Sequence, residues 1–242
     1  MDALKQAVRT YARHHANRDG LASTPVPGLR MMCVEEPAGD LHSVYRPLVC
    51  FVLQGAKRMM VGSEERVFCE GQSVIVGADM PVVGRIVEAS REAPYLAIAV
   101  ELEMALLREV AAQIGDTGSS HTSRMQTLFA DNTEGAMIDC AWRLMQLLDR
   151  PNAAPILRTG IMRELHYWLL SGLHGPALRT LADPDGYAGR LAAAIAVLRA
   201  EYRSRLPVER LAAAAAMSLT AFHKHFIHCV VWNCQSRTEA SL

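Results

Sequence analysis

The polar residues best suited to contact a ligand lie close together near the end of the chain, in the run SLTAFHKHF at 218–226. Phe222 and Phe226 are four residues apart, a spacing that places both side chains on one face of a helix. The side chains that fall largely on its other faces are Thr220, Ala221, His223 and Lys224. Polar and basic groups on an exposed helix can hydrogen-bond base edges and phosphates in the major groove of DNA. An ordinary helical hairpin with solvated polar side chains explains the pattern about equally well.

A short helix is expected directly before this run, in PVERLAAAAA at 207–216. Pro207 suits the first turn of a helix, where its missing N–H costs nothing. The alanines would let a second helix approach closely, and Ser218 would cap that second helix at its N-terminus. If the hairpin binds DNA, the candidates for contact are Thr220, Ala221, His223 and Lys224. Thr220 and His223 would contact base edges, and Lys224 a base or a phosphate. Phosphate contacts would then come from the basic side chains Arg203, Arg205 and Lys224.

The elements that carry this hairpin begin with a β pattern. Runs rich in branched and aromatic residues at 48–54, 56–61, 66–70 and 73–76 alternate with glycine-containing turns, and two further runs end near Leu102. Short strands at this spacing are typical of a sandwich or a small barrel. Before them, an amphipathic helix is predicted at the N-terminus.

Beyond Leu102 the apolar spacing becomes helical. Helices are predicted at 103–114 and 136–149, and a third after Pro155. The stretch 176–188 is rich in turn-forming residues and is expected to be a linker. A fourth helix follows, with an apolar stripe formed by Leu191, Ile195, Leu198 and Tyr202.

The formal net charge is zero, but the charges are unevenly distributed. Residues 1–188 carry 18 Lys and Arg against 22 Asp and Glu, whereas residues 189–242 carry 7 against 3. A basic tail on an acidic body indicates that only the tail meets a polyanion, and a solvated surface explains this surplus almost as well. No apolar run approaches the ~20 residues of a membrane span. We expect no secretory signal, no membrane partner, a cytoplasmic location and reduced cysteines.

The segment PVERLAAAAAMSLTAFHKHF resembles the first helix-turn-helix of the arabinose-operon regulator (AraC) family. Segments 24–32, 46–62 and 78–102 are similar to the N-terminal domain of one branch of that family, which pairs a cupin-like β-barrel with connecting helices. The resemblance implies an α+β fold with five parts: an N-terminal helix (1–23), a cupin-like sensor domain (24–102), a helical connector or dimerisation region (103–175), a linker (176–188) and a partial helix-turn-helix domain (189–242). It also implies a homodimeric transcription regulator that binds promoter or operator DNA.

The family's DNA-binding domain holds two helix-turn-helix units joined by a long helix, and the residues after Phe226 do not match the second unit. Our hypothesis is a truncation or a reading-frame change after Phe226, which sequencing of the source gene would test. A chain with one unit is expected to bind DNA with weakened specificity, since each good base contact contributes ~1–3 kcal/mol.

The barrel is the expected place for a small-molecule effector. Inward side chains that could line its pocket are Phe51, Leu53, Met60, Val74 and Val76. The simpler interpretation is that they only fill the barrel, because alternation along a strand does not separate a filled barrel from a hollow one. The alternative function for the chain is a small-molecule-binding or dimerisation module whose DNA-binding part is vestigial.

The sequence gives less support to a metal site or an enzyme than to a DNA-binding regulator. A cluster of possible zinc ligands at the C-terminus lacks the paired spacing of a structural zinc site; its members are His223, His225, His228, Cys229 and Cys234. A cupin metalloenzyme needs several histidines and a glutamate on its inner strands, and residues 29–102 contain one histidine, His42. We therefore expect no enzyme, no bound metal and no cofactor.

Overall fold

The computed structural model describes residues 1–61, 64–115, 128–183, 187–201 and 206–223. Its helices are α1 (Asp2–His15), α2 (Met104–Ile114), α3 (Gly135–Gln146), α4 (Ala154–Ser171), α5 (Gly175–Ala182), α6 (Tyr187–Glu201) and α7 (Val208–Ala214). Its strands are β1 (Leu21–Ser23), β2 (Leu29–Val34), β3 (Leu41–Tyr45), β4 (Leu48–Gln54), β5 (Ala56–Val61), β6 (Glu64–Cys69), β7 (Gln72–Val76), β8 (Met80–Glu88), β9 (Tyr95–Glu101) and β10 (Leu128–Asn132).

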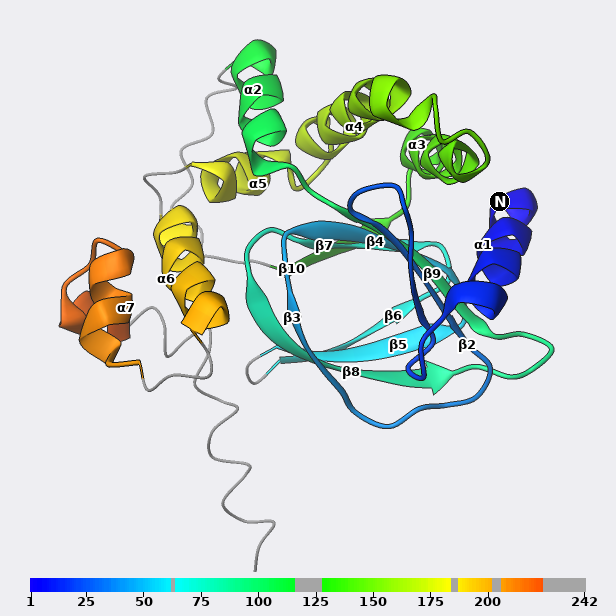
Figure 1. Ribbon diagram of the computed structural model, residues 1–242, viewed down its shortest axis with the longest axis horizontal. Coiled ribbons are helices and arrows are strands. Elements are labelled where there is room, and N and C mark those ends of the chain that lie inside the picture. Colours follow the sequence, from blue (N-terminus) through cyan, green and yellow to red (C-terminus); the bar gives the residue numbers. More distant parts are fainter. Residues whose placement is uncertain (62–63, 116–127, 184–186, 202–205, 224–242) are drawn as a thin grey trace, which may run out of the picture.

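The strands form two antiparallel sheets that face each other as a barrel (Figure 1). The six-stranded sheet has the order β1-β2-β9-β4-β7-β10, and the four-stranded sheet has the order β3-β8-β5-β6. Helices α2 to α5 lie over the outer face of the six-stranded sheet, and α1 packs beside β2 and β9 (Figure 1). The expected α+β fold, a β-barrel followed by helices, is confirmed.

Strand β4 separates two hydrophobic cores. Val49, Phe51 and Leu53 pack with the helices that cover the outer face of the sheet. Leu48 and Val52, on the other face of the same strand, pack inside the barrel. Because side chains alternate along a strand, a central strand covered on both faces is apolar at nearly every position.

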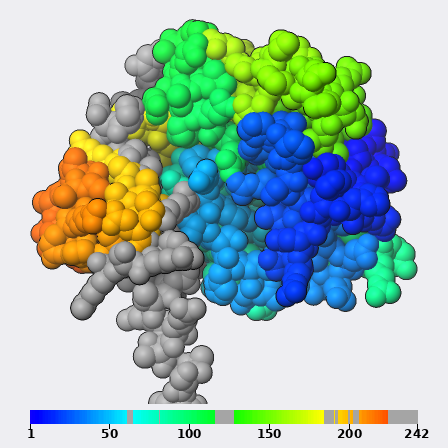
Figure 2. Space-filling view, viewed as in Figure 1, coloured from blue at the N-terminus to red at the C-terminus, as the bar shows by residue number. Residues whose placement is uncertain are grey.

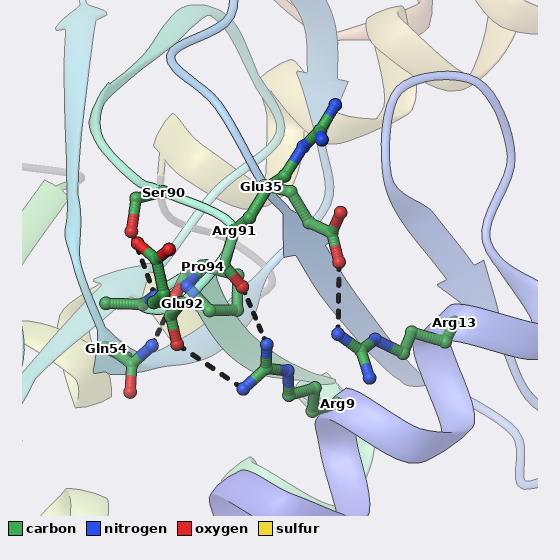
Figure 3. Close-up of polar contacts among 9 residues, drawn as sticks. Arg9, Arg13, Glu35, Gln54, Ser90, Arg91, Glu92 and Pro94 are labelled. Carbon is green, nitrogen blue, oxygen red and sulfur yellow. Dashed lines mark hydrogen bonds and ion pairs between the residues drawn. The ribbon is translucent and has the colours of Figure 1, made fainter.

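Helix α1 is held on the barrel by its buried Leu4 and Val8. Polar contacts at its surface, shown in Figure 3, also hold it there. The Arg9 guanidinium donates hydrogen bonds to the carbonyl oxygens of Arg91, at 2.7 Å, and Glu92, at 3.4 Å, in the turn between β8 and β9. Arg13 forms an ion pair with Glu35 at 3.3 Å. These contacts tie the N-terminal helix to two parts of the barrel that are distant in sequence.

Two segments have secondary structure that was not predicted from the sequence. The predicted linker 176–188 contains most of α5, whose Leu178 and Leu181 are buried against α2 and α4. Strand β10, for which no strand was predicted, completes the six-stranded sheet by pairing with β7. Both elements are short, and tertiary packing decides their conformation more than local preference does.

Candidate functional site

The C-terminal helices share a small core of their own. Its five buried residues are Ala194, Leu211, Ala212, Ala215 and Phe222. Four small or medium side chains let α6, α7 and the following helical turn approach closely, and the Phe222 ring, which is fully buried, fills the space between them. The prediction that Phe222 points inward is confirmed, whereas Phe226 lies outside the described residues. In the space-filling view, α6 and α7 stand at one side of the molecule, away from α1 (Figure 2).

Helix α7 ends in a tight turn that sets the direction of the next helix. The Met217 N–H donates to the Ala212 carbonyl, and the Ala216 N–H donates to the Ala213 carbonyl, each at 3.0 Å. These two bonds form a Schellman motif, with Ala216 in the left-handed position at φ 49°. Glycine usually occupies that position, because a Cβ makes the left-handed conformation unfavourable. The hydrogen bonds and the packing of Met217 offset this cost.

Ser218 caps the helix that follows. Its Oγ accepts a hydrogen bond from the Ala221 N–H at 3.2 Å, and its carbonyl accepts one from the Phe222 N–H at 2.8 Å. A serine at this position satisfies an N–H group that would otherwise lack a partner within the helix. The predicted N-cap is confirmed, and the described part of the helix runs from Leu219 to His223.

The exposed side of this helix carries two of the predicted DNA contacts. Thr220 and His223 are exposed, Ala221 is half-buried, and Phe222 is covered by α6 and α7. The remaining basic candidates, Lys224, Arg203 and Arg205, lie outside the described residues. Arg210, which sequence reasoning did not single out, bridges α7 to α6 through an ion pair with Glu201 at 2.6 Å.

Three of the five predicted pocket residues do not line the barrel interior. Phe51 and Leu53 face the covering helices, and Met60 is 43% exposed. Val74 and Val76 do lie among the buried side chains inside the barrel. The assignment to the inner face was wrong for β4 because both faces of that strand are apolar, and a shift by one residue exchanges the two faces.

The barrel interior instead contains a lysine that was not predicted. Lys57 lies on β5 beside the inward Met59 and is only 8% exposed. Its ammonium donates a hydrogen bond to the Tyr45 hydroxyl at 2.9 Å. Strand β5 has the sequence AKRMMV. Because side chains alternate along a strand, Lys57 lies on the same face as the buried Met59. This alternation is the sequence pattern from which an inward lysine could have been predicted.

Among the described residues, no group of three histidine, cysteine, aspartate or glutamate side chains is arranged to hold a metal ion. His42 is an exposed residue of β3. Four of the five residues weighed as zinc ligands, namely His225, His228, Cys229 and Cys234, lie outside the described part of the chain. Within that same part, no helix is long and apolar enough to cross a membrane.

The chain thus combines a cupin-like barrel covered by helices with a capped helical hairpin. The family described as the AraC-type transcriptional regulator N-terminus matches residues 25–177. Since this match spans more than half of the chain, the protein belongs to that family and is a transcription regulator of AraC type. None of the curated proteins matches the chain in sequence.

Two solved structures of ToxT share the fold of this chain. ToxT from Vibrio cholerae strain SCE256, with an unsaturated fatty acid bound, aligns with a TM-score of 0.56 and 6% identity over 83% of this chain and 72% of its own. ToxT from strain O395, bound to (E)-4-(8-methylnaphthalen-1-yl)but-3-enoic acid, aligns with a TM-score of 0.57 and 8% identity over 83% and 74%. The AraC-like activator CuxR aligns with a TM-score of 0.39 and 12% identity over 85% and 73%.

Proposed function

We propose that this regulator binds double-stranded promoter or operator DNA through the helix that begins at Leu219. The observation that carries the proposal is the orientation of that helix, whose Phe222 is buried while Thr220 and His223 are exposed. A helix presented by a short partner helix through a tight turn fits the major groove. Thr220 and His223 then contact base edges, and Lys224, Arg203 and Arg205 neutralise phosphates.

Replacing Thr220 and His223 together by alanine is expected to weaken DNA binding ~10-fold or more, because each base contact contributes ~1–3 kcal/mol. Fluorescence anisotropy measures this with a duplex enriched from random DNA on the wild-type chain, at one fixed salt concentration. His42→Ala, at an exposed position of the barrel, is the matched control and should leave the affinity unchanged. Equal affinities of the double variant and the wild type, or failure to enrich any duplex, would contradict the proposal.

The N-terminal domain acts, in this proposal, as a sensor for a small-molecule effector. Two ToxT structures with this fold hold a carboxylic acid. Lys57 inside the barrel favours a ligand-binding role for the domain, which also supports the alternative function, a small-molecule-binding module with a vestigial DNA-binding part. A cytoplasmic location follows from a role at promoter DNA.

Helix α4 is the surface we propose for a homodimer. Ile156 is 77% exposed and Tyr167 is 44% exposed. They are eleven residues apart, about three helical turns, and therefore share one face. Ile156→Lys is expected to convert a dimer into a monomer in sedimentation velocity, whereas Val67→Lys on β6, another exposed apolar position, should not. A wild-type chain that is monomeric at micromolar concentrations would refute this interface.

A further inference from the structure

Lys57 is the charged side chain whose position in the barrel needs an explanation. Across β5 its neighbours in the sheet are Phe68 on β6 and Ile86 on β8. Both of these side chains are buried inside the barrel, at 2% and 1% exposure. An ammonium group that leaves water for such surroundings is unfavourable unless an anion or several acceptors compensate it.

The contacts of Lys57 do not supply that compensation. An ammonium group has three N–H donors, and within the described residues the ammonium of Lys57 donates one hydrogen bond, to the Tyr45 hydroxyl at 2.9 Å. Its Nζ lies 5.6 Å from the centre of the Tyr45 ring. This distance is near the ~6 Å limit for a cation–π contact, and it agrees with an ammonium at the rim of the ring, beside the hydroxyl. Within the described part of the chain, no carboxylate pairs with Lys57.

Neighbouring acidic groups in the barrel stay neutral and do not balance the charge. Burial raises the pKa of the Cys50 thiol to about 11, although the charge of Lys57 acts to lower it. Burial also raises the pKa of the Tyr95 hydroxyl well above its ordinary value, and the Cys50 and Tyr45 groups add to the shift. At neutral pH both groups keep their protons, so neither provides an internal anion for Lys57.

The sheet leaves room for this side chain at Gly84. This glycine lies on β8 at an inward position, between the buried Val82 and Ile86. A Cβ at position 84 would collide with Cε of Lys57 and would lie 3.1 Å from its Nζ. A position without a side chain thus accommodates the lysine inside the barrel. Tyr45, its hydroxyl partner, is half-buried on β3, an edge strand of the four-stranded sheet.

We propose that Lys57 and Tyr45 bind the carboxylate of a small acid whose apolar body lies in the barrel. The carboxylate accepts hydrogen bonds from N–H groups of Lys57 and from the Tyr45 hydroxyl. Charge-assisted hydrogen bonds of this kind are stronger than those between neutral groups. The buried side chains of the barrel interior are apolar and would contact an apolar body; they include Val52, Met59, Phe68, Val82 and Ile86. A single cation favours a monoanion. Describing this acid as an effector rests on the proposed function.

The test measures binding of three acids to the full chain without DNA: decanoate, 1-naphthaleneacetate and cis-parinarate, each beside its neutral methyl ester. At least one acid is expected to bind the wild type, and its ester to bind more weakly. Lys57→Met is expected to lower the affinity for that acid about 10- to 100-fold, because it removes a hydrogen bond to a charged group. The affinity for the ester should stay unchanged. Arg58, the next residue of β5, forms an ion pair with Glu65. As a control, Arg58→Met should leave the affinity for the acid unchanged.

The melting temperature shows whether the variants are folded. Lys57→Met should melt at or above the wild-type temperature, because replacing a buried, uncompensated charge by an apolar group is often stabilising. Lys57→Gln serves as a second variant if the first does not fold. No saturable binding of any of the three acids, equal binding of acid and ester, or unchanged acid affinity in a folded Lys57 variant would overturn the proposal. Since the assay contains no DNA, these outcomes leave the DNA-binding proposal to its own test.

Discussion

Replacing Phe222 by alanine is expected to destabilise the unit of α6, α7 and the capped helix by about 3–5 kcal/mol, the range for truncating a buried phenylalanine. Phe222 is the one aromatic ring among the five buried residues of that core, and three of the other four are alanines. A core this small has few other contacts to compensate. The variant should therefore lose the helix that presents Thr220 and His223, and with it DNA binding.

Limited proteolysis with trypsin measures this effect, since cleavage tracks the population of the open form. Cleavage at Arg210 is expected to accelerate at least ~10-fold in Phe222→Ala, while the melting of the barrel stays unchanged. Leu219→Ala, on the same helix but at a 41% exposed position, is the matched control and should cleave at the wild-type rate. Equal protection of Phe222→Ala and wild type would show that this core does not hold the unit together.

His166→Leu is expected to lower the free energy of unfolding of the N-terminal part by about 1–3 kcal/mol, the cost of an unsatisfied buried donor. His166 of α4 is fully buried. Its Nε2 accepts a hydrogen bond from the Glu103 N–H at 3.1 Å, and its Nδ1 lies 2.5 Å from the Met162 carbonyl oxygen. A carbonyl only accepts, so Nδ1 carries the proton and the ring is neutral. Leucine would leave the Glu103 N–H, before the first turn of α2, without its partner.

The stability contributed by His166 should depend on pH. Burial lowers the pKa of His166; the hydrogen bond to Met162 and the charge of Glu103 act to raise it, and Arg158 adds to the lowering. The folded state therefore resists protonation, whereas the unfolded chain binds a proton near pH 6.5. The contribution of His166 to stability is therefore fully present above pH 6.5. It is lost as the pH falls from 6.5 towards the lowered pKa that His166 has in the folded state.

Urea unfolding between pH 8 and pH 5 tests both statements. The difference in unfolding free energy between wild type and His166→Leu should shrink as the solution becomes more acidic. His42→Ala, at an exposed histidine, should follow the wild-type profile. A difference that is constant with pH would show that His166 is not held in its neutral form.

Sequence patterns predicted the strands closely where turns contain glycine. The predicted runs 48–54 and 56–61 coincide with β4 and β5, because a turn residue and branched side chains define both ends of each run. The N-cap at Ser218 and the inward Phe222 were also predictable, since capping and helical spacing are local properties.

The features that depend on long-range packing were not predictable from the sequence. Phe51 and Leu53 face the helices because β4 lies between two cores, and no local pattern distinguishes those cores. Strand β10 forms because β7 offers it a free edge. Lys57 becomes unusual only once the barrel closes around it, since lysine in a single strand is commonly solvated. The proposed role of Lys57 could therefore be inferred only from the three-dimensional structure.

We propose that the helix beginning at Leu219 contacts DNA. Hydrogen exchange measured by mass spectrometry, with and without a saturating duplex enriched on the wild-type chain, tests it most directly. DNA binding by this helix is expected to slow exchange in peptides that cover Ser218–His223 and to leave exchange in β5 and β8 of the barrel unchanged. Unchanged exchange across Ser218–His223 in the DNA-bound chain, or protection confined to the barrel, would contradict it.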